Sequence, residues 1–306
     1  MVRAILTRVL QTFPALIGVT AIAFVLLHLS GDPSYVLLPP EATEEQRAAF
    51  RQAYGLDQPL PVQYLTYVVR LAQGDLGTSL NYREPALAVV MRRFPNTIQL
   101  AVIATIIAVV VAIPAGTLAA VRRGRAVDRL VMLVALLGQS VPTFWLGILF
   151  ILLLSVTLHW LPASGQGTWA QLILPSVTLA VWMVALLARL TRSEMLEVLQ
   201  QEYVRTARAK GLRDELVVLR HGLRNAAIPI VTILGLQFGG LLGGAVMTET
   251  VFAWPGVGTL ILDSILKKDY PVVLAGTTVV AFAFILINLA IDLLYSYLDP
   301  RLRRAT

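Results

Sequence analysis

The sequence predicts an all-α integral membrane protein, and three observations carry this prediction. Of its 306 residues, 57% are apolar and only 14% are charged, with a mean hydropathy of +0.74, whereas soluble domains have about 25% charged residues. Several long runs contain no charged side chain at all. Lys and Arg, which give the chain its net charge of +7, gather between alternate runs, as they do in the cytoplasmic loops of membrane proteins.

Five uncharged runs predict six membrane spans. A helix of about 20 residues crosses the bilayer core, so four of the runs hold one span each. The run 130–188 is long enough for two, because HWLPASGQGTW (159–169) interrupts it with Pro, Gly and interfacial Trp. The predicted spans of this single domain, 1–306, are 9–29, 97–120, 130–158, 171–188, 226–248 and 271–295.

The basic residues predict the orientation of the spans. Arg3 and Arg8 precede the first run, which is longer than a signal-peptide core and lacks a cleavage site, so we expect an uncleaved first span. With the N-terminus in the cytoplasm, most of the 25 Lys and Arg fall on the cytoplasmic side, and the loop 159–169 on the other side has none. Both termini and the segment 189–225, here called the basic segment, are then predicted to be cytoplasmic.

The segment 30–96, here called the hydrophilic segment, is the one long stretch expected on the outer side. Its sequence PPEATEEQRAAFRQAYGL predicts a short surface helix in which Thr43 and Gln46 form a capping box. Phe50 and Tyr54 share one face of this helix, and Gly55 can end it. A polar spacer and a docking surface for an external partner are both compatible with this pattern.

The basic segment contains EYVRTARAKGLRDELVVLRHGLRN (202–225), which must lie in water. Each charged residue costs about 2.5–3.5 kcal/mol at the centre of a membrane helix. Good helix formers fill 202–210, Gly211 ends that helix, and a second amphipathic turn follows. Small residues are expected to fit a groove in a partner, although a basic loop on anionic lipid is also compatible. The small residues are Ala207 and Ala209, the projecting basic residues are Arg205, Arg208, Lys210 and Arg213, and the second turn carries Leu212, Leu216, Val217 and Leu219.

Motifs for enzyme chemistry are absent or incomplete. The chain has no GxxxxGK[ST] phosphate loop, no HExxH motif and no cysteine, so we expect no cofactor or metal in it. Ser155 and His159 have the spacing of an intramembrane protease pair, but no glycine-flanked nucleophile accompanies them, and a polar helix end explains them better. No basic groove with interleaved aromatic residues predicts nucleic-acid binding. The chain is therefore predicted not to be an enzyme.

Ion-coupled carriers need ionisable groups deep in the bilayer. The candidates are Glu249 and Asp263, at or beyond the external end of the fifth span, and Asp292, near the cytoplasmic end of the sixth. None of them is predicted to lie in the middle of a span. These positions give no support to a proton or sodium relay. The alternative function is nevertheless an ion-coupled secondary carrier without ATPase partners.

Glycine and proline mark the places where spans are expected to pack closely or bend. Gly235, Gly239 and Gly243, with Gly240 and Gly244 beside them, give the fifth span a small-residue face. This face fits packing within the chain, a subunit interface or a pathway lining. Four prolines are expected to break or bend spans, and the aromatic residues after the third are candidates for the pathway or the interface. The prolines are Pro14, Pro114, Pro142 and Pro175, and the aromatic residues are Phe144 and Trp145.

The basic segment and the stretch after it resemble the signature loop of binding-protein-dependent ABC importer permeases. That signature reads EAA, three residues, Gly, nine residues, then Ile-x-Leu-Pro. Here Arg205-Thr206-Ala207 takes the EAA place, Gly211 the glycine place, and His221, Leu223 and Arg224 the last three places. The departures from the consensus are similar to the dipeptide/oligopeptide-type subfamily. Further motifs that match this peptide/nickel/glutathione branch are GDP (31–33), GLDQPL (55–60), GDLGTS (74–79), FPNTIQLA (94–101), SVPTFWLG (140–147), VFAWPGVG (251–258) and DYP (269–271).

The resemblance implies an ABC type I importer permease fold with six transmembrane helices and a cytoplasmic coupling helix between helices 4 and 5. It implies import of dipeptides, oligopeptides or related solutes such as glutathione across the cytoplasmic membrane of a prokaryote, by alternating access. The implied partners are a sister permease subunit in a heterodimer, two ABC ATPase subunits that hold ATP and magnesium, an extracytoplasmic substrate-binding protein, and membrane lipid. The residues expected to contact the ATPase are Glu202, Tyr203, Arg205, Thr206, Ala207, Arg208, Ala209, Lys210, Gly211 and Leu212.

Overall fold

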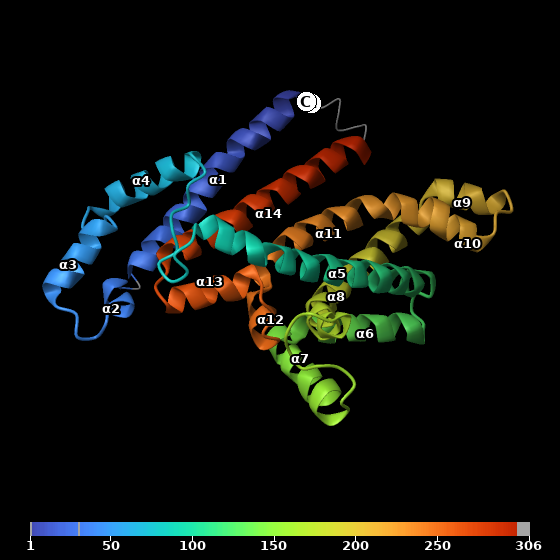
Figure 1. Ribbon diagram of the computed structural model, residues 1–306. Coiled ribbons are helices and arrows are strands. Elements are labelled where there is room, and N and C mark those ends of the chain that lie inside the picture. Colours follow the sequence, from blue (N-terminus) through green and yellow to red (C-terminus); the bar gives the residue numbers. More distant parts are fainter. Residues whose placement is uncertain (1, 30, 299–306) are drawn as a thin grey trace. The chain divides into compact units, whose positions relative to one another are not determined.

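The computed structural model describes residues 2–29 and 31–298 (Figure 1). The regular structure in this part of the chain is helical, with one isolated bridge between Thr78 and Pro85, so the predicted all-α class is confirmed. The C-terminal residues 299–306, which were expected in the cytoplasm, lie outside the described residues. The same holds for the side chain of Asp292 and for the burial of Gly244.

Most helices follow one another closely, and the longer connections are 73–85 and 158–168. The first third of the chain contains α1 (Val2–Leu29), α2 (Ser34–Leu37), α3 (Glu44–Ala53), α4 (Leu60–Ala72) and α5 (Ala86–Val121). The middle contains α6 (Ala126–Ser140), α7 (Thr143–Phe150), the π-helical segment η1 (Ile151–Thr157), α8 (Trp169–Leu199), α9 (Glu202–Ala209), α10 (Asp214–Leu216) and the π-helical segment η2 (Val217–Leu223). The last part contains α11 (Arg224–Gly244), α12 (Val246–Val251), α13 (Val257–Leu266) and α14 (Tyr270–Leu298).

Four helices among the described residues are long and apolar enough to cross a membrane. They are Ala86–Val121, Trp169–Leu199, Asp214–Gly243 and Tyr270–Ile291. A fifth crossing results if Ala126–Ser140 and Thr143–Thr157 count as one bent span. The apolar parts Pro14–Leu29 and Val257–Leu266 are shorter. By length and composition, the described residues thus hold four or five candidate crossings, and the six predicted spans stay a prediction.

The predicted span 130–158 is interrupted, because α6 and α7 meet at an angle of 103°. Val141 and Pro142 are both extended at this joint, with ψ angles of 126° and 133°, as expected for a proline and the residue before it. The break expected at Pro142 is therefore confirmed. The helices α1, α5 and α8 instead continue through Pro14, Pro114 and Pro175.

The chain divides into two units, of which the first is Met1–Thr97 with Pro255–Ile285. Its core joins α1, α4, the start of α5, α13 and α14 through buried side chains such as Phe24, Val90 and Leu260. The Tyr67 hydroxyl lies 2.7 Å from the Thr278 hydroxyl inside this unit. Burial raises the pKa of the Tyr67 phenol, which therefore stays neutral.

The second unit is Ile98–Trp254 with Leu286–Thr306, and α8 is its central helix. It packs against α6, α7, α11 and α12. The buried residues Ala112, Leu187, Met195 and Ile230 form one core cluster of this unit. Alanines on α5 keep the side chains between helices small, which lets helices approach closely, as is common in membranes.

Candidate functional site

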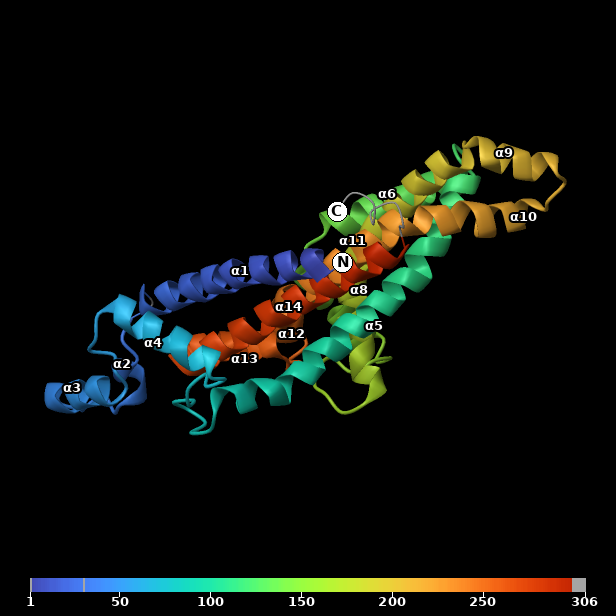
Figure 2. The same cartoon turned by 90° about the horizontal axis from the view of Figure 1, so that it is seen from above.

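The basic segment is more regular than a loop. Helix α8 does not end with the uncharged run at Ala188 but continues to Leu199, and α9 follows after two residues. Figures 1 and 2 both show α9 and α10 side by side at one end of this segment. Gly211 has a φ angle of +75° directly after the C-cap Lys210, so the predicted helix end is confirmed.

Helix α9 has one buried face and one free face. Val204 and Ala207 are buried, at 0% and 6% exposure, in a small cluster with Val217 of η2 and Leu199 of α8. The free face is centred on Ala209, with Glu202, Arg205 and Thr206 around it. Ala207 therefore packs inside the chain rather than being available to a partner, whereas Ala209 is available.

The second turn of the basic segment is mostly exposed. Val217 is fully buried, but Leu212, Leu216 and Leu219 are 42%, 50% and 59% exposed. The amphipathic face predicted there consequently has one inward anchor and three outward apolar side chains. Tyr203 of α9, at 43% exposure, adds an aromatic ring to the outer surface.

The basic side chains around α9 are solvated. Arg205 pairs with Glu202 at 2.8 Å and Arg208 with Asp214 at 3.1 Å, and all four side chains are largely exposed. Exposed ion pairs of this kind contribute about 0–1 kcal/mol. Lys210 is also exposed. The rim of the free face is thus charged and polar, while its centre is small.

A buried ion pair lies at the base of the basic segment. Arg192 of α8 donates from Nε to Asp128 Oδ1 at 2.5 Å and from Nη2 to Oδ2 at 2.9 Å. The Gly124 N–H donates to the same Oδ2 at 2.9 Å. The Asp128 side chain is 5% exposed and that of Arg192 is 27% exposed. Sequence reasoning missed this pair, since nothing in a single sequence connects two residues 64 positions apart.

Helix α5 touches the same part of α8. A Cβ atom at Gly116 would lie 2.5 Å from the Ala188 carbonyl oxygen and 2.7 Å from Thr191 Cβ. Real Cβ atoms do not approach so closely, so this position accepts only glycine without a shift. The backbones of α5 and α8 are therefore in direct contact here.

The hydrophilic segment contains the predicted surface helix α3, which follows α2. The capping box is confirmed, because Gln46 N–H donates to Thr43 Oγ1 at 3.3 Å and Thr43 N–H to Gln46 Oε1 at 3.0 Å. The Phe50 and Tyr54 rings lie 4.6 Å apart, and Gly55 has a φ angle of +67° after the helix.

Asp269 fastens the end of the hydrophilic segment to the start of α14. Its carboxylate is buried and accepts four hydrogen bonds, of 2.5 Å from Ser79 Oγ, 3.1 Å from Leu80 N, 3.1 Å from Asn81 N and 3.2 Å from Asn81 Nδ2. This pairing gives a physical reason for two of the motifs found in the sequence, GDLGTS and DYP. Sequence reasoning did not connect them.

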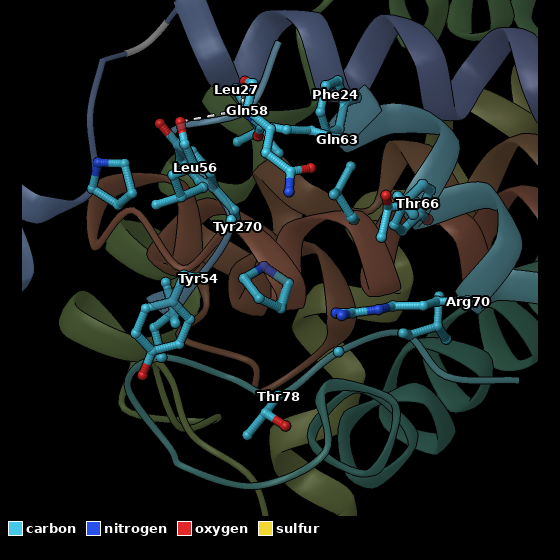
Figure 3. A pocket seen from close by; sticks show the side chains of 18 of the residues that line it. Phe24, Leu27, Tyr54, Leu56, Gln58, Gln63, Thr66, Arg70, Thr78 and Tyr270 are labelled. Carbon is cyan, nitrogen blue, oxygen red and sulfur yellow. Dashed lines mark hydrogen bonds between the residues drawn. The ribbon is translucent and has the colours of Figure 1, made fainter. Parts of the chain in front are cut away.

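A cavity of about 520 Å³ opens in the first unit (Figure 3). Arg70 and Tyr54 line it, and Figure 3 shows the Arg70 side chain extending across it. His28 lies at its wall, with Nδ1 2.9 Å from Phe24 O and Nε2 2.9 Å from Gln63 Oε1. The polar lining of the cavity thus includes the histidine–glutamine pair, Arg70 and Asp75.

The protease pair is not formed. His159 Nδ1 lies 3.2 Å from the Thr157 carbonyl oxygen, and in the described part of the chain no hydrogen bond joins His159 to Ser155. Among the carrier candidates, Glu249 is fully buried on α12 and Asp263 is exposed on α13.

The small-residue face is used partly within the chain. A Cβ atom at Gly235 would overlap the Ile291 side chain of α14, so this glycine serves packing inside the second unit. Gly239 is buried, while Gly243 is exposed and Gly240 has no neighbour within 4 Å of an added Cβ. Phe144 and Trp145, after Pro142, are 46% and 48% exposed.

The helical fold and the several apolar helices long enough to cross a membrane are those of a polytopic membrane protein. The sequence profile of the family described as "Binding-protein-dependent transport system inner membrane component" matches residues 112–304, and that of its N-terminal part matches residues 1–101. The chain belongs to this family.

Known relatives and a solved structure are consistent with membership of this family. The chain is 45% identical over 304 residues to "Glutathione transport system permease protein GsiC" of Salmonella paratyphi A and 44% identical to that of Escherichia coli K12, covering 99% of each chain. It is 20% identical, with a TM-score of 0.56, to a chain in the structure of "Inward facing conformations of the MetNI methionine ABC transporter". The match covers 69% of this chain and 96% of that one and shows the shared fold. The protein is thus a permease component of a binding-protein-dependent ABC importer.

Proposed function

We propose that this chain forms, with a sister permease, the pathway of an ATP-driven importer for glutathione or other small peptides. Identity of 45% over the full length to glutathione permeases supports this substrate class. Six spans with both termini and the basic segment in the cytoplasm agree with the distribution of Lys and Arg.

The free face of α9 is the proposed contact with an ATPase subunit, and it is the observation that carries the proposal. Its small centre at Ala209 admits a close approach, and Arg205 and Lys210 at its rim offer charge to a partner. The opposite face is anchored by Val204 and Ala207, so α9 is held by its own chain before any partner binds. ATP-driven closure of two ATPases would then move α9 and switch the pathway between inward- and outward-facing states.

The sister permease and the binding protein are assigned to other surfaces. Phe144 and Trp145 are exposed apolar side chains beside the broken helix, which supports contact with the sister subunit or the pathway there. Gly243 supplies a further exposed small position. The hydrophilic segment, on the outer side in this orientation, is the surface proposed for the substrate-binding protein.

The test is recovery of partners with the tagged chain in mild detergent, followed by uptake of labelled glutathione into proteoliposomes. The informative variant is Ala209→Glu, which places a charge at the centre of the free face and leaves the buried face intact. We expect recovery of the ATPase to fall about tenfold or more, as for the centre of an interface. The matched control is Glu215→Ala, an exposed change on α10.

Normal ATPase recovery and uptake with Ala209→Glu would remove α9 from this role. Uptake that needs an ion gradient and no ATP would favour the alternative of a secondary carrier. Competition of labelled glutathione by dipeptides would place the substrate within the wider peptide class.

A further inference from the structure

The stretch of α8 beyond Ala188 is the connection between the membrane-spanning part of the second unit and α9. It continues for eleven residues to Leu199, about 16 Å at the rise of an α-helix. A helix end passes a displacement on to neighbouring helices only where it is packed against them. Contacts at three successive levels of α8 supply such packing.

The lowest level is the junction with α5 and α6. Gly116 places the backbone of α5 against Ala188 and Thr191. One residue further, Arg192 forms its two-pronged bond with Asp128, next to the α5–α6 turn. A bidentate guanidinium–carboxylate pair fixes both the distance and the relative orientation of its partners, unlike a single hydrogen bond.

The upper levels connect the same helix to α9. A Cβ atom at Gly222 of η2 would lie 3.0 Å from Met195 Cε and 3.3 Å from Leu199 Cδ2, so η2 rests directly on α8. Leu199 then packs with Val217 of η2 and with the buried face of α9. Packed groups therefore run without interruption from the α5–α6 turn to α9.

We propose that Asp128 and Arg192 are positioning residues that brace the extension of α8, so that a displacement of α9 reaches α5 and α6. The proposal rests on the proposed function, in which α9 receives the movement of an ATPase. Without the brace, α8 can shift against α5 and α6, and the same movement of α9 displaces these two helices less. The pair therefore sets how much solute moves for each ATP hydrolysed.

The first test replaces both charges, since removing one would leave the other buried and unpaired. The variant is Asp128→Asn with Arg192→Gln, and Arg192→Lys is the conservative counterpart that keeps the charge and loses the fork. The control is Arg129→Gln with Glu197→Gln, which removes one charge of each sign at exposed positions of the same two helices, α6 and α8. The measurement is labelled glutathione imported per ATP hydrolysed by the complete transporter in proteoliposomes.

For the neutral pair, we expect normal ATPase recovery and a solute-to-ATP ratio lowered about fivefold, a size typical of changes along a coupling route. Arg192→Lys is expected to lie between wild type and the neutral pair, and the control to match wild type. An unchanged ratio overturns the proposal. Equal losses of import and ATP hydrolysis, which leave the ratio unchanged, overturn it too and indicate a purely structural pair.

A second readout is independent of the ATPase contact. The chain has no cysteine, so Arg123→Cys at the α5–α6 turn and Glu215→Cys on α10 place two spin labels on exposed positions of the second unit. In assembled transporters with cysteine-free partners, we expect the distance distribution to broaden with the neutral pair and not with the control. A distance distribution that stays narrow with the neutral pair overturns the proposal. If Ala209→Glu leaves ATPase recovery and uptake normal, the proposed function is overturned, but the bracing of α8 by Asp128 and Arg192 is not.

Discussion

The hydrophilic segment and the basic segment are both polar stretches of an apolar chain, and they are held in different ways. Buried polar groups fasten the hydrophilic segment, through the four hydrogen bonds of Asp269 and the contact of Tyr67 with Thr278. The basic segment is held by apolar and small side chains such as Val204 and Gly222, and by a single buried ion pair at its base.

The difference shows how a polar segment is made available to a partner. In the hydrophilic segment, many hydrogen-bonding groups are already satisfied by the chain itself. In the basic segment, apolar anchors on one face of α9 leave the charged side chains in solvent. A segment anchored in the second way keeps its polar surface for another protein.

The largest loss of stability is expected when the Asp269 hydrogen bonds that hold the hydrophilic segment are removed. Asp269→Ala removes the acceptor of four hydrogen bonds, of which the one from Ser79 is buried and the three from Leu80 and Asn81 are partly buried. A buried donor left unsatisfied costs about 1–3 kcal/mol. We expect the free energy of unfolding to fall by about 3 kcal/mol or more, measured by thermal unfolding in detergent. Trypsin cleavage after Arg83, an exposed residue of the released loop, should accelerate.

Asp263→Ala is the matched control for this variant, because Asp263 is exposed on the helix before it. It should unfold like the wild type. Equal stability of the two variants would show that the four hydrogen bonds do not hold the hydrophilic segment.

An intermediate effect is expected at the base of the basic segment. Gly116→Ala forces a methyl group against the Ala188 carbonyl, and overpacking of this kind costs about 1–3 kcal/mol. Thermal unfolding of Gly240→Ala provides the comparison, since a Cβ there meets nothing within 4 Å. If both glycines tolerate alanine equally, close helix contact is not what holds this segment.

The smallest loss of stability is expected at a feature that both segments share, a glycine that ends a helix. Gly211 and Gly55 end their helices with φ angles of +75° and +67°, and neither has a neighbour within 4 Å of an added Cβ. Alanine at either position should cost about 1 kcal/mol from backbone strain alone, and asparagine should cost less. Unequal losses in thermal unfolding would mean that one of the two turns does more than end a helix.

Local patterns allowed much of this architecture to be predicted. The capping box of α3, the end of α9 at Gly211 and the break at Pro142 each follow from a few neighbouring residues, and each is confirmed. The uncharged runs predict where apolar helices lie, although α8 continues eleven residues beyond its run, because helix-forming charged residues extend it into water.

The remaining features depend on residues that are distant in the sequence. Asp269 binds a loop about 190 positions earlier, and Arg192 binds a carboxylate 64 positions earlier. Ala207 and Ala209 are the same residue type two positions apart, and only the location of Val217 decides which one is buried. A single sequence contains no information on such pairings.

The broken helix has a consequence for the bilayer around it. α6 has 15 residues, about 22 Å of helix, and α7 with η1 is equally long, so neither half alone spans a hydrocarbon core of about 30 Å. At the joint, the Val141 N–H still donates to Leu137 O and Pro142 O still accepts from the Leu146 N–H. The break nevertheless interrupts the hydrogen-bond ladder between α6 and α7, and a helix end has backbone groups without an intrahelical partner, for which lipid offers no substitute. Wherever this joint lies within the membrane, hydration or a second polypeptide must therefore reach it, and the hydrocarbon there cannot be continuous.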